Sequence, residues 1–199
     1  MLLFLTRFRL VFAGFGLFSG LALSEVALAQ IEEPAFKLVA KDGAFEVRDY
    51  APMIVAEVAV EGERDSAVNS GFRILAGYIF GANTAQSKIA MTAPVTQTSA
   101  GNSWLIRFSM PASFTLETLP KPNDERILIK KLPGRQVAVL GFSGLWTEGN
   151  LTQHREELAG ILKQKGLKPK GSATFAFYDP PWKPFFWRRN EILQEIEKH

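Results

Sequence analysis

The spacing of apolar residues along the chain switches between two and about 3.6 residues, which separates predicted strands from predicted helices. Residues 36–60 have the strand period, since Phe45-Glu46-Val47-Arg48 alternates apolar with charged positions. Lys41-Asp42-Gly43 just before them is a strong hairpin signal. Pro52 opens a further strand, from Met53 to Val60. We therefore expect a hairpin followed by a third strand.

Residues 64–80 change to helical spacing, and Gly81 and Asn83 end the predicted helix. Its apolar side consists of Val68, Phe72, Leu75 and Ile79. After a loop, the pattern predicts strands near 94–99 and 103–110. Prolines then break the next stretch into a loop, at Pro111, Pro120 and Pro122.

The second half of the chain repeats this order. Strands are predicted at 127–129 and 136–142, with Pro133-Gly134 between them, and a helix at about 147–165. Ala173 to Tyr178 is a further predicted strand, while the pattern of Glu191 to Ile196 fits a strand or a short helix. Because the helices interrupt hairpin-rich sheet, we expect an α+β fold of two similar halves.

The first 29 residues are predicted to be a signal peptide. Arg7 and Arg9 supply a positive start, the stretch from Leu10 to Leu23 has no charge, and Ala27-Leu28-Ala29 forms a cleavage site. The apolar run is shorter than the roughly 20 residues of a membrane span, and an uncleaved N-terminal anchor is the alternative. We expect one domain over residues 30–199, periplasmic or secreted, after cleavage near Ala29.

Charge and composition narrow the class of partner. Cleavage would remove Arg7, Arg9 and Glu25 and leave 21 basic and 19 acidic side chains. This near balance argues against nucleic acid as a partner, and we expect no membrane span once the signal is removed. The sequence has no cysteine, so stability must come from apolar burial rather than disulfides.

The sequence offers few residues for catalysis. It has no H-E-x-x-H, Walker or Rossmann pattern, and Ser143 in Gly141-Phe142-Ser143-Gly144 lacks the spacing of a nucleophile elbow. His154, the only histidine besides His199, edges the apolar side of the second predicted helix. It is either a ligand or base or a boundary residue whose ring tip meets water. We predict no enzyme and no metal site.

Two further segments have alternative interpretations. Residues 180–189 concentrate aromatic and basic side chains, which suits a flat ligand, a membrane interface or a single nucleic-acid strand. The balanced charge instead favours a proline-stiffened crossover whose rings pack on the sheet. Met91, in the segment from Lys88 to Val95, is either a soft surface against a ligand or core filler.

A series of motifs follows the order of one protein family and covers about residues 35–197. The motifs are residues 45–52, 71–83, 88–95, 108–111, 119–122, 142–144, 178–181 and 188–191. Together they resemble the SOUL haem-binding family, with Lys88 to Val95 matching its K-I-x-M-T-A-P-V signature, and the chain looks like a bacterial exported member. The resemblance implies a distorted antiparallel β-barrel of two similar halves flanked by two α-helices, related to bacterial effector-binding domains.

The resemblance also implies a ligand and its site. The family's named activity is binding of haem or a related tetrapyrrole, so haem is the implied cofactor. One branch holds the porphyrin by apolar contact with the first helix, which here implies a groove of Val68, Phe72, Leu75, Ile79 and Met91. The candidate propionate partners are Arg64, Arg73 and Lys183, and His154 is the candidate axial ligand. A histidine proposed to bind iron in another branch aligns with Asp49, so that ligation does not carry over.

Three functions are therefore compatible with the sequence. The leading hypothesis is non-enzymatic binding of haem or a related tetrapyrrole in an apolar groove, as a carrier or buffer in the periplasm. The first alternative is a binding module for another apolar small molecule in the same groove. The second is a hydrolase acting on a tetrapyrrole or an ester, with Ser143 and His154 as its candidate residues.

Overall fold

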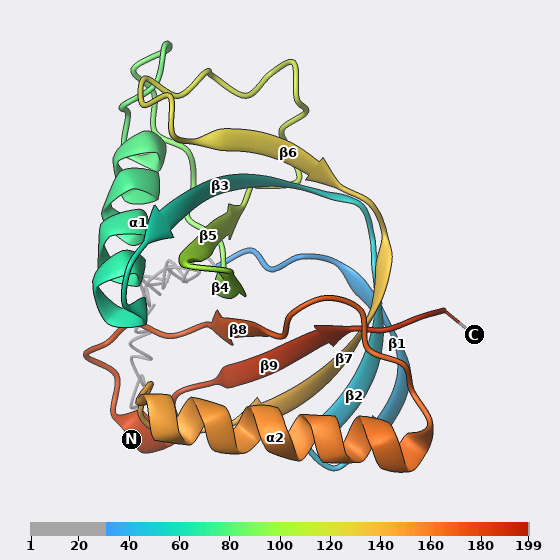
Figure 1. Cartoon of the computed structure of the whole chain (residues 1–199). Coiled ribbons are helices and arrows are strands. Elements are labelled where there is room, and N and C mark those ends of the chain that lie inside the picture. Colours follow the sequence, from blue (N-terminus) through green and yellow to red (C-terminus); the bar gives the residue numbers. More distant parts are fainter. Residues whose placement is uncertain (1–30, 199) are drawn as a thin grey trace, which may run out of the picture. The chain divides into compact units, whose positions relative to one another are not determined.

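The computed structural model describes residues 31–198, which contain nine strands and two helices (Figure 1). The strands are β1 (Phe36–Asp42), β2 (Phe45–Tyr50), β3 (Met53–Glu61), β4 (Val95–Ala100), β5 (Ser103–Ser109), β6 (Leu128–Leu132), β7 (Arg135–Phe142), β8 (Thr174–Phe177) and β9 (Asn190–Glu195). The helices are α1 (Arg64–Ile79) and α2 (Glu148–Lys165), and Phe185–Trp187 forms a 3-10 turn. The segment that fitted either a strand or a helix is therefore a strand, β9. The predicted signal segment 1–29 lies outside the described residues.

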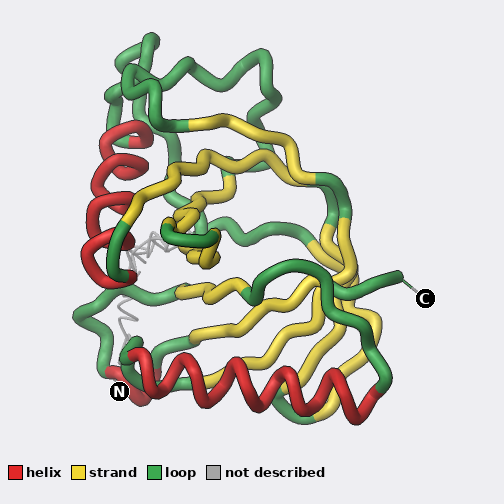
Figure 2. The backbone as a smooth tube through the Cα atoms, in the orientation of Figure 1, coloured by secondary structure: helices red, strands yellow, loops and turns green. Residues whose placement is uncertain are grey.

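All nine strands belong to one antiparallel sheet, in the order β1-β2-β7-β9-β8-β4-β5-β3-β6. Figure 2 shows that this sheet curls on itself. No strand pairing within residues 31–198 joins the edge strands β1 and β6. The predicted antiparallel barrel with two flanking helices is thus confirmed as an open, half-barrel sheet.

The two halves of the sheet exchange one strand each, β2 and β6. The units β3-α1-β4-β5 and β7-α2-β8-β9 have the same order, and in each the first strand pairs with the last. However, β2 precedes β3 in the chain and pairs with β7, while β6 precedes β7 and pairs with β3. Neither half therefore completes its part of the sheet without a strand from the other.

Both helices pack on the same face of the sheet, each over its own core. α1 covers β3 and β5, and α2 covers β7 and β9. The pairs Val95–Phe177 and Gln97–Phe175 join the two halves, and side chains of paired residues share a face. The core under α1 includes Leu75, Tyr78, Ile79, Val58 and Ile106. The core under α2 includes Leu151, Leu158, Leu162, Phe175 and Ile192.

The ends of α2 follow from local chemistry. The Thr147 hydroxyl accepts a hydrogen bond from the Asn150 backbone nitrogen at 3.4 Å, which satisfies one of the free N–H groups of the first turn. Gly166 closes the helix in the left-handed conformation, with φ 68°. Lys163 and Lys165 lie in the last turn, where the helix dipole favours positive charge.

Gly71 determines how closely α1 approaches β5. A Cβ atom at this position would lie 2.8 Å from both Cδ1 and Cγ1 of Ile106 and 3.1 Å from its Cβ. Ile106 is 0% exposed. Because the contact reaches the Cβ of Ile106, a change of its side-chain rotamer cannot relieve it, and the helix would have to move.

We expect Gly71→Ala to lower the free energy of unfolding by about 1–3 kcal/mol, because it overpacks the core under α1. Gly77→Ala in the same helix is the matched control, since no atom lies within 4 Å of a Cβ placed there. That control should be stabilised by roughly 0.5–1 kcal/mol through helix propensity. Urea denaturation measures both changes. Stabilisation of both variants would show that α1 tolerates a larger separation from β5.

Candidate ligand-binding site

The residues predicted to form an apolar groove divide between the core and the surface. Leu75 and Ile79 are 0% and 2% exposed and belong to the core under α1. This corrects the predicted groove, because their helical spacing directs them onto the sheet and away from a surface ligand. Phe72 and Met91 are 39% and 47% exposed, and Val68 lies half-buried at the edge of the same core.

Phe72 and Met91 lie at the same end of β5. The Phe72 ring meets the ring of Phe108 edge-on, with the centroids 5.5 Å apart. Met91 precedes Thr92, whose hydroxyl donates a hydrogen bond to the Ser109 carbonyl oxygen at 2.7 Å. Since Phe108 and Ser109 are neighbours in β5, these contacts place both exposed apolar side chains near one end of that strand. Both side chains are exposed to solvent, although Phe108 and Ser109 point to opposite faces of β5.

Arg64 is not available to a propionate, although it was a candidate. Its guanidinium group is buried, with Cζ 5.8 Å and 6.0 Å from the ring centroids of Phe175 and Phe177. Nη1 donates to the Trp146 carbonyl oxygen at 3.2 Å. Burial lowers the pKa of this side chain. Arg64 therefore ties the start of α1 to the segment before α2, and this corrects its predicted role.

The other two candidate bases are accessible to different degrees. Arg73 is exposed on α1, one residue from Phe72. Lys183 is half-exposed and donates to Asp179 Oδ1 at 2.7 Å, so its charge is already paired. Of the three candidate bases, Arg73 is the exposed one on the helix that carries Phe72.

His154 lies on α2, where its ring stacks on Phe142 with centroids 4.3 Å apart. Its Nδ1 is 2.9 Å from Glu157 Oε2. With Nδ1 held by a carboxylate, Nε2 is the ring nitrogen left for a ligand. Because α2 covers β7 and β9, whereas α1 covers β3 and β5, His154 belongs to a different helix and core from Phe72. Within residues 31–198, no group of three or more His, Asp or Glu is arranged to hold a metal ion.

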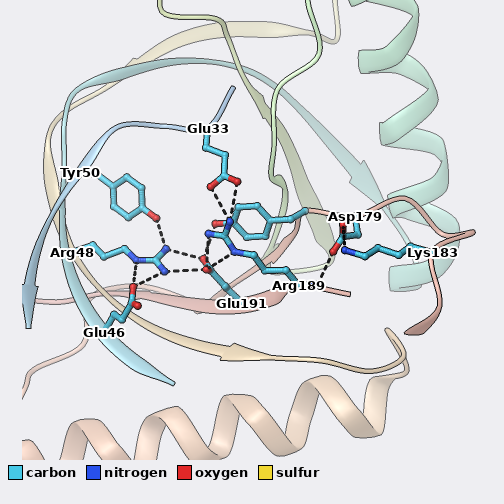
Figure 3. Close-up of polar contacts among 9 residues, drawn as sticks. Glu33, Glu46, Arg48, Tyr50, Asp179, Lys183, Arg189 and Glu191 are labelled. Atoms are coloured by element: carbon cyan, nitrogen blue, oxygen red, sulfur yellow. Dashed lines mark hydrogen bonds and ion pairs between the residues drawn. The ribbon is translucent and has the colours of Figure 1, made fainter. Parts of the chain in front are cut away.

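The face of the sheet opposite the helices carries a charged network that sequence reasoning missed (Figure 3). Arg48 on β2 donates to both carboxylate oxygens of Glu191 on β9, at 2.9 and 3.0 Å. The pair spans β7, which lies between these strands, and its members are only 5% and 3% exposed. Tyr50 accepts from Arg48 at 3.1 Å, and Tyr178 donates to Glu191 at 2.6 Å. Burial, with the negative charge of Glu191, raises the pKa of Tyr178 above its ordinary value, so its phenol stays protonated.

This network continues toward the ends of the described chain. Arg189 donates to Glu191 at 3.0 Å and to both carboxylate oxygens of Glu33, at 2.9 and 3.0 Å (Figure 3). The Asp179 carboxylate accepts from the backbone nitrogen of Arg189 at 2.6 Å. These bonds connect the segment before β1 to the segment before β9.

A second ion cluster lies on the same face, at Glu57 of β3. Its carboxylate accepts hydrogen bonds from Arg107 Nε and from Lys130 Nζ, the latter at 2.6 Å. Burial acts to raise the pKa of Glu57, but the two cationic donors outweigh burial and hold that pKa below its usual value. The opposite face of the sheet is therefore charged on both of its halves.

One sequence feature of this face, the alternation of charged and apolar residues in β2, has two interpretations. Charged residues alternate with apolar ones in β2, which is typical of a strand with one buried and one solvated face. The polar side of β2 is instead covered: Arg48 is buried beneath the Phe36 ring, whose centroid lies 4.5 Å from its Cζ, and against Glu191. The alternation reveals the polar side, but it does not show that this side is enclosed.

Comparisons with known proteins identify the family. The sequence model described as SOUL heme-binding protein matches residues 31–195. The chain belongs to the SOUL haem-binding family. SOUL membership supports haem as a bound ligand. Heme-binding protein 2 of Mus musculus is 29% identical over 147 residues, covering 68% of this chain and 72% of the relative. Heme-binding protein 2 of Homo sapiens is 29% identical over 157 residues, covering 73% and 76%.

Solved structures confirm the fold class of this SOUL protein. The EcmrR C-terminal domain is similar with a TM-score of 0.62 at 14% identity, over 78% of this chain and 98% of that domain. A hydrolase from Listeria innocua is similar with a TM-score of 0.55 at 14% identity, over 80% of this chain and 94% of the hydrolase. At these identities the likeness concerns the fold alone. No helix among residues 31–198 is long and apolar enough to cross a membrane.

We expect Glu191→Gln to lower the free energy of unfolding by about 1.5–3 kcal/mol, because the buried Arg48 guanidinium loses the charge of its bidentate partner and keeps only Glu46 as a countercharge. Asp42→Asn is the matched control, since it breaks the exposed pair between Asp42 and Lys165 and should leave stability close to that of the unchanged protein. Thermal and urea unfolding measure the difference. Equal stability of the two variants would show that the buried pair does not hold β2 and β9 together.

Proposed function

We propose that this SOUL protein is a non-enzymatic binder of haem or a related tetrapyrrole, which it holds mainly by apolar contact. The observation that carries the proposal is the exposure of two apolar side chains, Phe72 and Met91, within a chain that matches the family over residues 31–195. The curated relatives are named as haem-binding proteins. Its role is that of a carrier or buffer for the macrocycle.

The residues around α1 fit haem in part. Phe72 and Met91 offer a ring and a soft thioether to the face of the macrocycle. Arg73, beside Phe72, supplies a cation for a propionate. Leu75, Ile79 and Arg64 support this surface from beneath and do not touch the ligand. A bound haem would supply iron and its redox chemistry, while these residues bind and orient the macrocycle.

Apolar contact is sufficient for useful affinity. A micromolar Kd corresponds to about 8 kcal/mol. Burial of about 330 Å² of apolar surface supplies that free energy at about 25 cal/mol per Å², and each 4 kcal/mol of association cost requires about 160 Å² more. Iron ligation is therefore not required by the proposal, and His154 lies on the other helix.

We expect haemin to bind the protein of residues 30–199 with a saturable Soret shift at micromolar concentration. Phe72→Ala should weaken this binding about tenfold, because it removes the exposed ring that covers the macrocycle. Phe186→Ala is the matched control, since Phe186 is 56% exposed in the 3-10 turn and lies outside the proposed surface. Absence of a saturable shift would contradict haem binding, and equal affinity of the two variants would contradict the site.

His154→Ala tests whether haem is held by apolar contact alone or also by a bond between His154 and the iron. We expect its haemin complex to keep the Soret spectrum and affinity of the unchanged protein, because the proposed contacts are on α1. Far-UV circular dichroism checks that α2 is intact, since His154 also packs on Phe142. Loss of a sharp low-spin spectrum in this variant alone would show that Nε2 binds the iron.

The proposal includes export, with the protein acting in the periplasm or as a secreted protein. Its support is the sequence of the first 29 residues: Arg7, Arg9, the uncharged run and the small residues Ala27 and Ala29. We expect intact-mass measurement of the expressed protein to give a chain beginning at Gln30. Ala29→Arg should block this processing, and Ser24→Thr should not. A full-length mass in the membrane fraction would show a retained anchor.

A further inference from the structure

A cavity of about 280 Å³ lies on the face of the sheet opposite the helices. This volume is near the lower end of small-molecule pockets, which span about 300–1,000 Å³. Both halves of the sheet contribute to its apolar wall, which includes Met53, Val55, Leu132, Val137 and Leu193. The strand exchange places these residues around one space, because Leu132 and Val137 flank the turn between β6 and β7.

The cavity is on the other side of the sheet from the proposed haem surface. Arg107 lines the cavity, and its neighbours Ile106 and Phe108 belong to the core under α1. Successive side chains of a strand point to opposite faces. A ligand in the cavity and a ligand on Phe72 are therefore separated by the thickness of the sheet.

Positive charge predominates among the ionisable groups of the cavity wall. Arg107, Arg135 and Lys170 line it, with Glu195 as the acidic residue of the wall. Arg107 is positioned by its Nε bond to Glu57. Within residues 31–198, that is its one hydrogen bond to a side chain, so its terminal nitrogens are left for another acceptor.

Arg135 is the most unusual of these groups. Its guanidinium has no hydrogen-bond or ion-pair partner within the described chain, 31–198, although it lies in a protein wall rather than in open solvent. Burial lowers the pKa of Arg135, Glu195 offsets this and Arg107 adds repulsion. None of its nitrogens is among the fully buried unpaired atoms of the described residues, so these donors remain open to the cavity. Among the described residues, the folded chain thus holds a half-buried cation that bonds to no countercharge, with Glu195 acting on it only through space.

We propose that this cavity is a second ligand site, which binds a small organic anion through Arg135 and Arg107. A carboxylate or phosphate head accepts hydrogen bonds from the two guanidinium groups, whose planar forks match such oxygens. The apolar body of the ligand packs against Val137, Leu132 and Leu193. The ligand class is a compact acid with one apolar end, such as an aromatic or branched acid.

Size and charge separate this ligand from haem and from organic cations. A macrocycle of four pyrrole rings exceeds a space of about 280 Å³. An organic cation would meet Arg107, Arg135 and Lys170 against Glu195 alone, so like-charge repulsion disfavours it. The cavity therefore suits a small anion, whereas the proposed haem surface suits a large, mainly apolar macrocycle.

Calorimetric titration of the folded protein with sodium benzoate, phenyl phosphate and benzylammonium chloride tests the proposal. The three probes share one ring and differ in the charge and shape of the head group. We expect saturable binding of benzoate or phenyl phosphate, with a Kd at or below about 1 mM, and none of benzylammonium. The anion that binds with the lower Kd shows which head group the site prefers. No saturable binding of either anion, or equal binding of benzylammonium, overturns the proposal.

Two variants test whether the anion binds in the cavity. Arg135→Gln should weaken binding of the preferred anion at least about tenfold, since a charge-assisted pair is lost. Arg155→Gln is the matched control with unchanged affinity, because Arg155 is exposed on α2 and does not line the cavity. Val137→Phe fills the apolar part of the cavity while keeping Arg135, so it also should weaken binding. Unchanged affinity in both cavity variants overturns the assignment. Haemin titration of Arg135→Gln should match the unchanged protein, which distinguishes failure of this site from failure of the haem surface.

Discussion

β2 and β6 each lie in the sheet beside a strand of the opposite half, and the rest of the molecule depends on this exchange. Through β2, Arg48 comes within reach of Glu191, although 143 residues separate them in the chain. Through β6, Lys130 comes within reach of Glu57. Each half lacks a strand until the other half is present, so both cores and the charged face between them form together.

The exchange gives the two sides of the sheet different chemistry. On one side, α1 and α2 bury apolar residues and leave Phe72 and Met91 at a surface. On the other side, charged residues of both halves face one another across a curled sheet. Most of these charges are compensated, by bidentate contact at Glu191 and by two donors at Glu57. Arg135 differs from them, and its environment is what gives the cavity a preference for anions.

The candidate site was predictable only where it follows from local pattern. Helical spacing identified Val68, Phe72, Leu75 and Ile79 as one side of α1, and the structure divides this side between sheet and solvent. Spacing cannot make that division, because it depends on where β3 and β5 end beneath the helix. The same limit applies to Arg64, whose charge suggested a surface base but whose position beside Phe175 and Phe177 depends on the other half.

The sequence by itself determined the α+β class, the family and the order of strands and helices up to the last segment, which fitted either a strand or a helix. The reason is that period, turn residues and motifs are local properties. Asp42-Gly43 identified the β1–β2 hairpin, but the sequence did not determine how the other strands pair. Pro133-Gly134 marks a turn between β6 and β7, yet these strands pair with β3 and β2. Tertiary structure alone decided that exchange and the enclosure of the polar side of β2. The physical reason is that pairing and burial depend on residues far apart in the chain, as Arg48 and Glu191 are.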